Sequence, residues 1–257
     1  MTRIHSAFTN KKAFIGFVTG GDPTMAASEE IILAMIEAGA DLVEIGIPFS
    51  DPIAEGPVIQ AANIRALKAG ATTERIFELA THIRPKSDIP LVFLTYLNPV
   101  FHYGYERFFA RMKAVGMDGI IVPDLPYEER GEVADIADKY DIDVITLIAP
   151  TSKQRITELA RPARGFIYLV SSLGVTGVRS AITTDLSEIV ATARSVTDVP
   201  VAVGFGIHTP AQAAAIADIA DGVIVGSAIV KIVAEHGEEA AVAVGEYVRE
   251  MKEAIDR

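Results

Sequence analysis

The chain has 257 residues, half of them hydrophobic, with 23 Lys and Arg against 34 Asp and Glu and neither Cys nor Trp. The absence of Cys excludes a disulfide framework, a thiolate-bound metal and a thiol nucleophile. The net charge of −11 argues against binding nucleic acid, which normally needs a basic stripe. We expect one α/β domain over residues 1–257 in the cytoplasm, with no signal peptide and no membrane span.

Eight short apolar runs rich in β-branched residues predict β-strands. Each is too short and too uniformly apolar for a half-exposed antiparallel strand, so each is expected to be buried on both faces, as parallel strands are. In chain order the runs are Ala13–Thr19, Leu42–Gly46, Pro90–Leu94, Gly119–Val122, Asp143–Ile148, Phe166–Val170, Val201–Val203 and Gly222–Val225.

Segments with helical periodicity lie between these runs. The first is expected to open at Asp22-Pro23, which would supply a cap and a first-turn proline, and to end at Gly39. Two further apolar stripes consist of Val133, Ile136, Ala137 and Tyr140, and of Val244, Val248, Met251 and Ile255. Strand followed by helix, eight times over, predicts a closed (β/α)8 barrel, the TIM barrel.

An open, doubly wound sheet is the alternative architecture. A dinucleotide-binding sheet would carry Gly-x-Gly-x-x-Gly after its first strand, whereas Gly20-Gly21-Asp22-Pro23 stands there. A weak internal echo links Ala38–Asp41, Val115–Gly119 and Ile219–Val223. We interpret these three segments as repeated helix-to-strand turns in which Gly ends the helix.

Glu44 is the most informative polar residue because it interrupts an apolar strand. A carboxyl in that position must be paired, hydrogen-bonded or protonated. A raised pKa would suit a general acid–base group near neutral pH, and a structural carboxylate is the alternative. The loop that follows contains Asp51, which is expected to form a turn beside Pro52, and Glu55, which is either a second acid or a solvated loop charge.

Glycine-rich turns follow the last three predicted strands. Glycine lets backbone N–H groups approach an anion, and the start of a helix at Ser227 favours negative charge. Because barrel phosphate sites are often built from the loops after strands seven and eight, we predict a phosphate site here, with Lys231 facing outward from its helix. The turns are Gly174-Val175-Thr176-Gly177, Gly204-Phe205-Gly206 and Gly226-Ser227.

The remaining polar residues add no further chemistry. Tyr168 either places a hydroxyl in the barrel mouth or fills the barrel as a packing aromatic. The five histidines are scattered, and no pair has the i, i+4 spacing of a metal site, so we expect no metal. No Ser stands in a Gly-x-Ser-x-Gly elbow, so a Ser-His-Asp mechanism is unsupported.

Several of these segments resemble the tryptophan synthase alpha subunit family from about Phe14 to the last helix. The resemblance implies a (β/α)8 barrel that cleaves indole-3-glycerol phosphate to indole and glyceraldehyde 3-phosphate. It also implies no cofactor in this chain, and an alpha–beta–beta–alpha complex with a beta subunit that holds pyridoxal phosphate. The matching segments are Phe17–Pro23, Glu44–Pro52, Gly56–Gln60, Gly174–Gly177, Gly204–Ile207 and Gly226–Val230.

The same resemblance implies roles for individual residues. Glu44 would be the catalytic acid–base group, and Glu55 would take the place of the family's usual Asp toward the indole N–H. The backbone of Gly177, Gly206 and Gly226, with Ser227, would hold the phosphate. Thr176 would lie in a lid over residues 171–183. An apolar slot for the indole would be lined by Phe17, Leu94, Tyr96, Ile121, Tyr168 and Phe205.

Three other functions compete with this interpretation. The chain could be a stand-alone indole producer, a non-catalytic regulatory subunit that binds a sugar phosphate, or another phosphosugar barrel enzyme such as an isomerase. The intact Glu44 argues against the regulatory subunit. The largely apolar slot argues against an isomerase, which would need more polar contacts to a small polyol.

Overall fold

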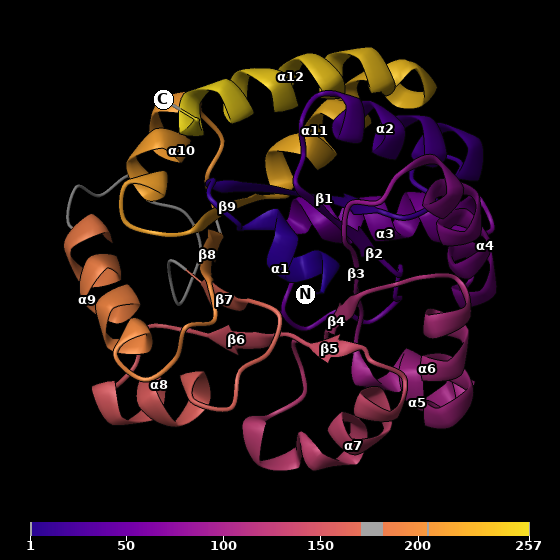
Figure 1. Ribbon diagram of the computed structural model, residues 1–257. Helices are drawn as coiled ribbons and strands as arrows, with labels where there is room; N and C mark the ends of the chain where they lie inside the picture. The colour runs from indigo at the N-terminus through magenta and orange to yellow at the C-terminus, as the bar shows by residue number, and fades with distance from the viewer. Residues whose placement is uncertain (1, 171–181, 205, 257) are drawn as a thin grey trace.

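Nine parallel strand segments form one sheet in the computed structural model, which describes residues 2–170, 182–204 and 206–256. The sheet order is β5-β4-β3-β2-β1-β9-β8-β7-β6, and the strands curve into a ring (Figure 1). The open-sheet alternative is therefore wrong. The strands are β1 (Ala13–Thr19), β2 (Leu42–Gly46), β3 (Leu91–Leu94), β4 (Gly119–Ile121), β5 (Asp143–Val144), β6 (Thr146–Ile148), β7 (Ile167–Val170), β8 (Val201–Gly204) and β9 (Gly222–Val225).

The two ends of that order, β5 and β6, are consecutive in the chain and flank Ile145. The expected single strand over Asp143–Ile148 is thus two short segments, each of which pairs with a strand on a different side. β5 pairs with β4, and β6 pairs with β7. Counted as one interrupted strand, they give the eight strands of a (β/α)8 barrel, so the barrel prediction is confirmed.

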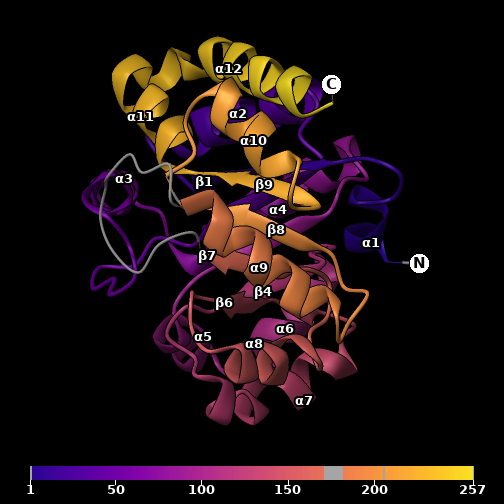
Figure 2. The same ribbon diagram turned by 90° about the vertical axis from the view of Figure 1, so that its left-hand side faces the viewer.

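Helices surround the ring on its outside (Figures 1 and 2). The first of these, α2, has Thr24 as its N-cap, whose side chain accepts from the Ala27 N–H; the expected cap at Asp22-Pro23 is therefore wrong. The α-helices are α1 (Arg3–Ala7), α2 (Met25–Glu37), α3 (Pro57–Lys68), α4 (Thr73–Ile83), α5 (Leu97–Tyr103), α6 (Tyr105–Ala114), α7 (Gly131–Lys139), α8 (Lys153–Ala160), α9 (Ile182–Arg194), α10 (Pro210–Ala217), α11 (Ser227–His236) and α12 (Ala240–Ile255). The 3-10 turns are η1 (Arg84–Lys86), η2 (Tyr127–Glu129) and η3 (Gly237–Glu239).

Alternate residues of each strand face two separate apolar clusters, as the period of two in a strand requires. The outer cluster joins strand residues such as Val43 and Ile45 to the buried faces of the helices. The inner cluster fills the barrel with the remaining strand positions, together with Ile4 of α1 and the adjacent Phe8. Residues of and next to α1 therefore help to fill the barrel interior.

The three echo segments hold neighbouring strands together at their N-terminal ends. Each segment contains an Asp that makes two hydrogen bonds to one residue of the neighbouring strand. Its backbone N–H donates to that residue's carbonyl, and its carboxylate accepts that residue's N–H, with N···O distances of 2.8–2.9 Å. The expected glycine ends the helix in the first two, at Gly39 and Gly116, but not in the third. The bridging aspartates are Asp41 to Phe14, Asp118 to Leu91, and Asp221 to Val201.

Candidate active site

Glu44 lies in β2 with its side chain turned into the barrel, because its neighbours Val43 and Ile45 both belong to the outer cluster. The residue is 1% exposed, and within the described residues its Oε1 atom has no hydrogen-bond partner. Burial raises the pKa of Glu44 to about 8. The carboxyl is therefore protonated at neutral pH, and it can both give and take a proton near that pH.

Two aromatic rings lie near Glu44 inside the barrel. Phe17 of β1 is its register partner. Burial, and then the negative charge of Glu44, raise the pKa of Tyr168 well above its ordinary value. Glycines leave room for both rings: a Cβ on Gly46 would lie 2.9 Å from Phe17 Cζ, and one on Gly204 would lie 2.7 Å from the Tyr168 hydroxyl. Gly204 therefore has a packing reason to be glycine.

The other residues expected in the indole slot take up two different positions. Leu94 and Ile121 belong to or pack against the inner cluster, the same space that Glu44 enters. Tyr96 is instead fully buried beside the loop after β2, where its hydroxyl accepts the Ala54 N–H at 3.0 Å. Its ring lies 5.4 Å from that of Phe49. Tyr96 thus supports the loop that carries Glu55.

Glu55 is half-buried where that loop meets α3. Its Oε2 accepts a hydrogen bond from Asn63 Nδ2 at 2.6 Å, and its backbone carbonyl accepts one from Gln60 Nε2 at 2.8 Å. Burial raises the pKa of Glu55, and the Asn63 bond lowers it. Glu55 is therefore a fixed group and not a solvated loop charge, although Asp51 in the same loop is exposed, as a turn residue would be.

The glycine turns are only partly described. Gly206 has a φ of +82°, and a Cβ there would meet nothing within 4 Å. Gly226 precedes α11, whose N-terminus has no side-chain cap, and Ser227 opens that helix as expected. Lys231 is exposed, also as expected. Thr176, Gly177, Phe205 and residues 171–181 of the expected lid lie outside the described residues.

Three buried polar groups near these residues were given no role by the sequence. Asn63 of α3 is 4% exposed and could have been noticed as an amide between two alanines on the apolar face of a helix. Thr19 and Thr95 follow apolar runs at the ends of β1 and β3, and their hydroxyls have no hydrogen-bond partner in the described part of the chain. A polar residue at the carboxyl end of a buried strand is the sequence signal that marks both threonines.

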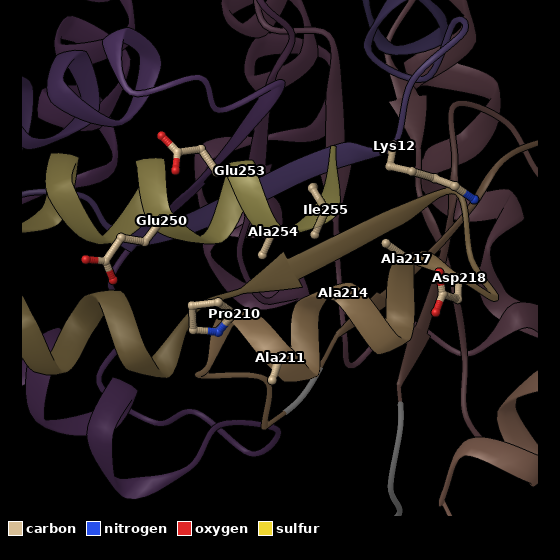
Figure 3. A pocket seen from close by; sticks show the side chains of 10 residues that line it. All are labelled: Lys12, Pro210, Ala211, Ala214, Ala217, Asp218, Glu250, Glu253, Ala254 and Ile255. Carbon is tan, nitrogen blue, oxygen red and sulfur yellow. The ribbon is translucent and has the colours of Figure 1, made fainter. Parts of the chain in front are cut away.

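Features outside the barrel do not compete with this site. A hollow of about 510 Å³ lies between α10 and α12, floored by Ala214 and Ala254 and edged by Lys12, Asp218 and Glu250 (Figure 3). It contains none of the residues expected in the site. Across residues 2–170, 182–204 and 206–256, no cluster of His, Asp and Glu is suited to hold a metal, and none of the helices described there is long and apolar enough to cross a membrane.

A parallel barrel with one buried carboxyl inside and a second, hydrogen-bonded carboxyl on the loop after β2 is typical of an enzyme of the (β/α)8 class. Comparison with known proteins narrows the class to one family. The profile of the family described as "Tryptophan synthase alpha chain" matches residues 5–256. The chain belongs to the tryptophan synthase alpha chain family.

Curated relatives and solved structures agree with that profile. The tryptophan synthase alpha chain of Lactiplantibacillus plantarum is 54% identical over 257 residues, covering 100% of this chain and 97% of the relative. That of Caldanaerobacter subterraneus subsp. tengcongensis is 50% identical over 240 residues, covering 91% and 92%. The solved alpha subunit from Legionella pneumophila str. Paris superposes with a TM-score of 0.91 at 34% identity, covering 100% of this chain and 99% of that one.

Membership of the family confirms the expected activity. The chain is an indole-3-glycerol-phosphate lyase of tryptophan biosynthesis and carries no cofactor of its own, since pyridoxal phosphate belongs to the beta subunit. A solved tryptophan synthase from Mycobacterium tuberculosis contains a chain that superposes with a TM-score of 0.90 at 34% identity, covering 100% of this chain and 99% of that one. The family thus implies a beta subunit as the partner. The regulatory-subunit and isomerase alternatives are wrong.

Proposed function

We propose that Glu44 is the acid–base group of the lyase reaction. The observation that carries the proposal is a carboxyl inside the barrel, 1% exposed, with a pKa raised to about 8. An acid that is protonated in the resting enzyme, with a pKa close to the working pH, can both deliver a proton to the substrate and remove one from it.

The chemistry needs one proton delivered and one removed. The Glu44 carboxyl gives its proton to C3 of the indole ring, which leaves a carboxylate and a cationic ring. The carboxylate then takes the proton of the glycerol hydroxyl next to the ring. As that O–H breaks, the hydroxyl carbon becomes an aldehyde, the carbon–carbon bond to C3 breaks, and its electron pair returns to the ring. Indole and glyceraldehyde 3-phosphate leave, and Glu44 is again protonated.

Glu55 is the partner of the indole N–H in this proposal. A carboxylate there accepts the N–H and stabilises the positive charge that the ring gains on protonation. Its half-buried position and its bond from Asn63 support a fixed acceptor. Within the proposal the ring lies in a slot lined by Phe17, Leu94, Ile121, Tyr168 and Phe205, while Tyr96 supports the loop that carries Glu55.

The phosphate end of the substrate is assigned to the backbone of Gly177, Gly206 and Gly226, with Ser227 and with Thr176 in the covering loop. The positive φ of Gly206 and the uncapped N-terminus of α11 support this assignment. N–H groups at a helix start bind an anion without needing a Lys or Arg, which suits a chain with a net charge of −11.

The test of the acid–base role is Glu44→Gln, which keeps the shape of the side chain but removes the proton. We expect indole release to fall by about a thousandfold or more, with substrate binding little changed. Single-turnover indole release and equilibrium binding of the substrate measure the two effects separately. Turnover near that of the parent chain would rule out the role.

We also propose that the chain works in the cytoplasm as the outer subunit of an alpha–beta–beta–alpha complex. Two exposed apolar side chains, one on the loop after β2 and one on α5, support a docking surface. Ile53 is 79% exposed and Phe101 is 64% exposed. Aromatic side chains such as Phe101 are enriched at protein interfaces.

Phe101→Glu tests this surface. We expect it to weaken binding to the pyridoxal-phosphate subunit by about tenfold or more while the isolated chain keeps its own indole release. Val242→Glu is the matched control, because Val242 is 72% exposed on α12, across the ring from α5 in Figure 1. Titration with the beta subunit measures binding. Indole release that the beta subunit does not change would favour the stand-alone lyase.

A further inference from the structure

The loop after β2 carries Glu55 and is held at three points, each by a different residue outside the loop. The Ala54 N–H donates to the Tyr96 hydroxyl at 3.0 Å, Gln60 donates to the Glu55 carbonyl at 2.8 Å, and Asn63 donates to Glu55 Oε2 at 2.6 Å. The first two contacts fix the backbone on either side of the side chain. Asn63 is the contact that reaches the carboxylate.

Asn63 is itself held in place by its helix. It is 4% exposed, on the face of α3 that also buries Ala62 and Ala66. Two residues further along, Arg65 donates to both carboxylate oxygens of Asp22, at 2.8 and 2.7 Å, which ties α3 to the loop after β1. An amide on a buried helix face is unfavourable unless it is hydrogen-bonded, and the hydrogen-bond partner of Asn63 is Glu55.

We propose that Asn63 is a positioning residue of the lyase reaction, which holds Oε2 of Glu55 and so sets the direction in which Oε1 meets the ring N–H of the substrate. The proposal rests on the proposed role of Glu55. A glutamate has one more rotatable bond than an aspartate, and an unheld carboxylate loses more rotamer freedom when substrate binds. A fixed amide removes that freedom before the substrate arrives.

The charges around Glu55 give this role a pH signature. Tyr96, from the segment after β3, is the titratable neighbour, and burial raises its pKa to about 12, with smaller effects of the Glu55 and Asp124 charges. It is therefore neutral at working pH. From its own loop Asp51 is exposed, and from α3 Arg65 is occupied by Asp22. The Asn63 bond is the contact that lowers the pKa of Glu55, so its removal raises that pKa.

The experiment is a double-mutant cycle between Asn63→Ala and Glu55→Gln, read as kcat, KM and the pH dependence of kcat/KM. We expect Asn63→Ala to lower kcat by about tenfold with KM changed by less than about threefold. The acidic limb of kcat/KM, which reports deprotonation of Glu55, should move to higher pH. In the Glu55→Gln background the same substitution should cost less than about twofold, because the carboxylate it positions is gone.

Gln60→Ala is the matched control. It removes an amide donor to the same glutamate, but from the backbone carbonyl, so the acidic limb should stay in place. Binding of glycerol 3-phosphate, a probe of the phosphate end, reports whether each variant keeps the folded site. Asn63→Asp provides a second variant that replaces the donor with a carboxylate, and it should move the acidic limb to higher pH as well.

The outcomes separate the two proposals. If Glu55→Gln keeps full activity, the role of Glu55 is wrong, whatever Asn63 does. If Glu55→Gln is impaired while Asn63→Ala leaves kcat and the acidic limb unchanged, Glu55 keeps its role and the positioning proposal is overturned. Equal losses from Asn63→Ala in both backgrounds would also overturn it, because they would show a structural effect.

Discussion

The buried carboxyl of Glu44 links the pH dependence of folding to that of the reaction. Its folded pKa of about 8 exceeds the ordinary value of 4.5, so between these values the folded chain keeps a proton that the unfolded chain has released. The free energy of unfolding therefore falls as pH rises through this window, and the effect is constant above it. Glu44→Gln removes this pH dependence. Across the window, the free energy of unfolding of the variant should therefore rise relative to that of the parent by up to about 5 kcal/mol.

Urea denaturation at about pH 5 and about pH 8.5 measures this gain. Glu253→Gln is the control, since Glu253 is exposed on α12 and should leave the slope with pH unchanged. If the stability curves of parent and Glu44→Gln run parallel over this range, then Glu44 is ionised in the folded chain. Its proposed role as the resting acid would fail with that result.

At the same residue scale, the sequence reveals Glu44 but not Asn63. A charged residue inside an apolar strand is unusual, and it can be recognised from the neighbouring residues in the sequence alone. The partner of Asn63 stands eight positions earlier, across a loop and a helix start, and only the path of that loop brings them to 2.6 Å. The role of Gly204 was hidden for a similar reason, because Tyr168 approaches it from another strand.

At the scale of elements, the bridging aspartates make each helix-to-strand turn a joint between two strands. Asp118 is the bridging aspartate that also binds two arginines. Arg84 and Arg3 donate to its carboxylate at 3.2 and 3.1 Å, and the Leu91 N–H donates to it at 2.9 Å. Asp118→Ala would leave that N–H without its acceptor and would remove the carboxylate partner of the largely buried Arg84. We expect a loss of about 3 kcal/mol in the free energy of unfolding.

Asp135→Ala, on the exposed face of α7, is the control for this loss and should cost less than about 0.5 kcal/mol. Because the joint lies at the N-terminal end of the barrel, the folded Asp118→Ala enzyme should keep its kcat. Chemical denaturation and indole release measure the two properties. A drop in kcat at temperatures where the variant is fully folded would contradict the separation of the joint from the site.

Elements themselves were predictable where their signal is local. Uniform apolar runs located the strands, and the stripe from Val244 to Ile255 located α12. The break at Ile145 was not predictable, because β5 and β6 change partners there to close the ring, which depends on strands far away in sequence. The cap of α2 was misplaced by two residues because Asp22, the expected cap, is taken by Arg65.

On the scale of the whole molecule, α12 fastens the end of the chain to its beginning. α12 packs against α2, α10 and α11. Lys252 Nζ lies 2.9 Å from Asp41 Oδ2 and donates to the Lys12 carbonyl at 2.9 Å. Lys252→Met would leave the buried Asp41 with less compensation, since Lys11 is its other cation and is more exposed. We expect a loss of about 2–4 kcal/mol in the free energy of unfolding.

Lys231→Met serves as the comparison, because Lys231 is exposed on α11 and its loss should change stability by less than about 0.5 kcal/mol. Thermal and urea unfolding of the two variants measure the difference. Equal stability of Lys252→Met and Lys231→Met would show that α12 is held by its apolar face alone.

The interrupted strand at Ile145 has a consequence for solubility at high concentration. An open sheet has two edge strands, whose unpaired N–H and C=O groups can pair with another chain. Here the ends are β5 and β6, which one residue joins, and Arg130 donates to the Val144 carbonyl and the Thr146 hydroxyl at 2.8 and 2.9 Å on either side of it. The Val144 carbonyl at the break is thus occupied, and strand addition at this point would first require the Arg130 contact to open.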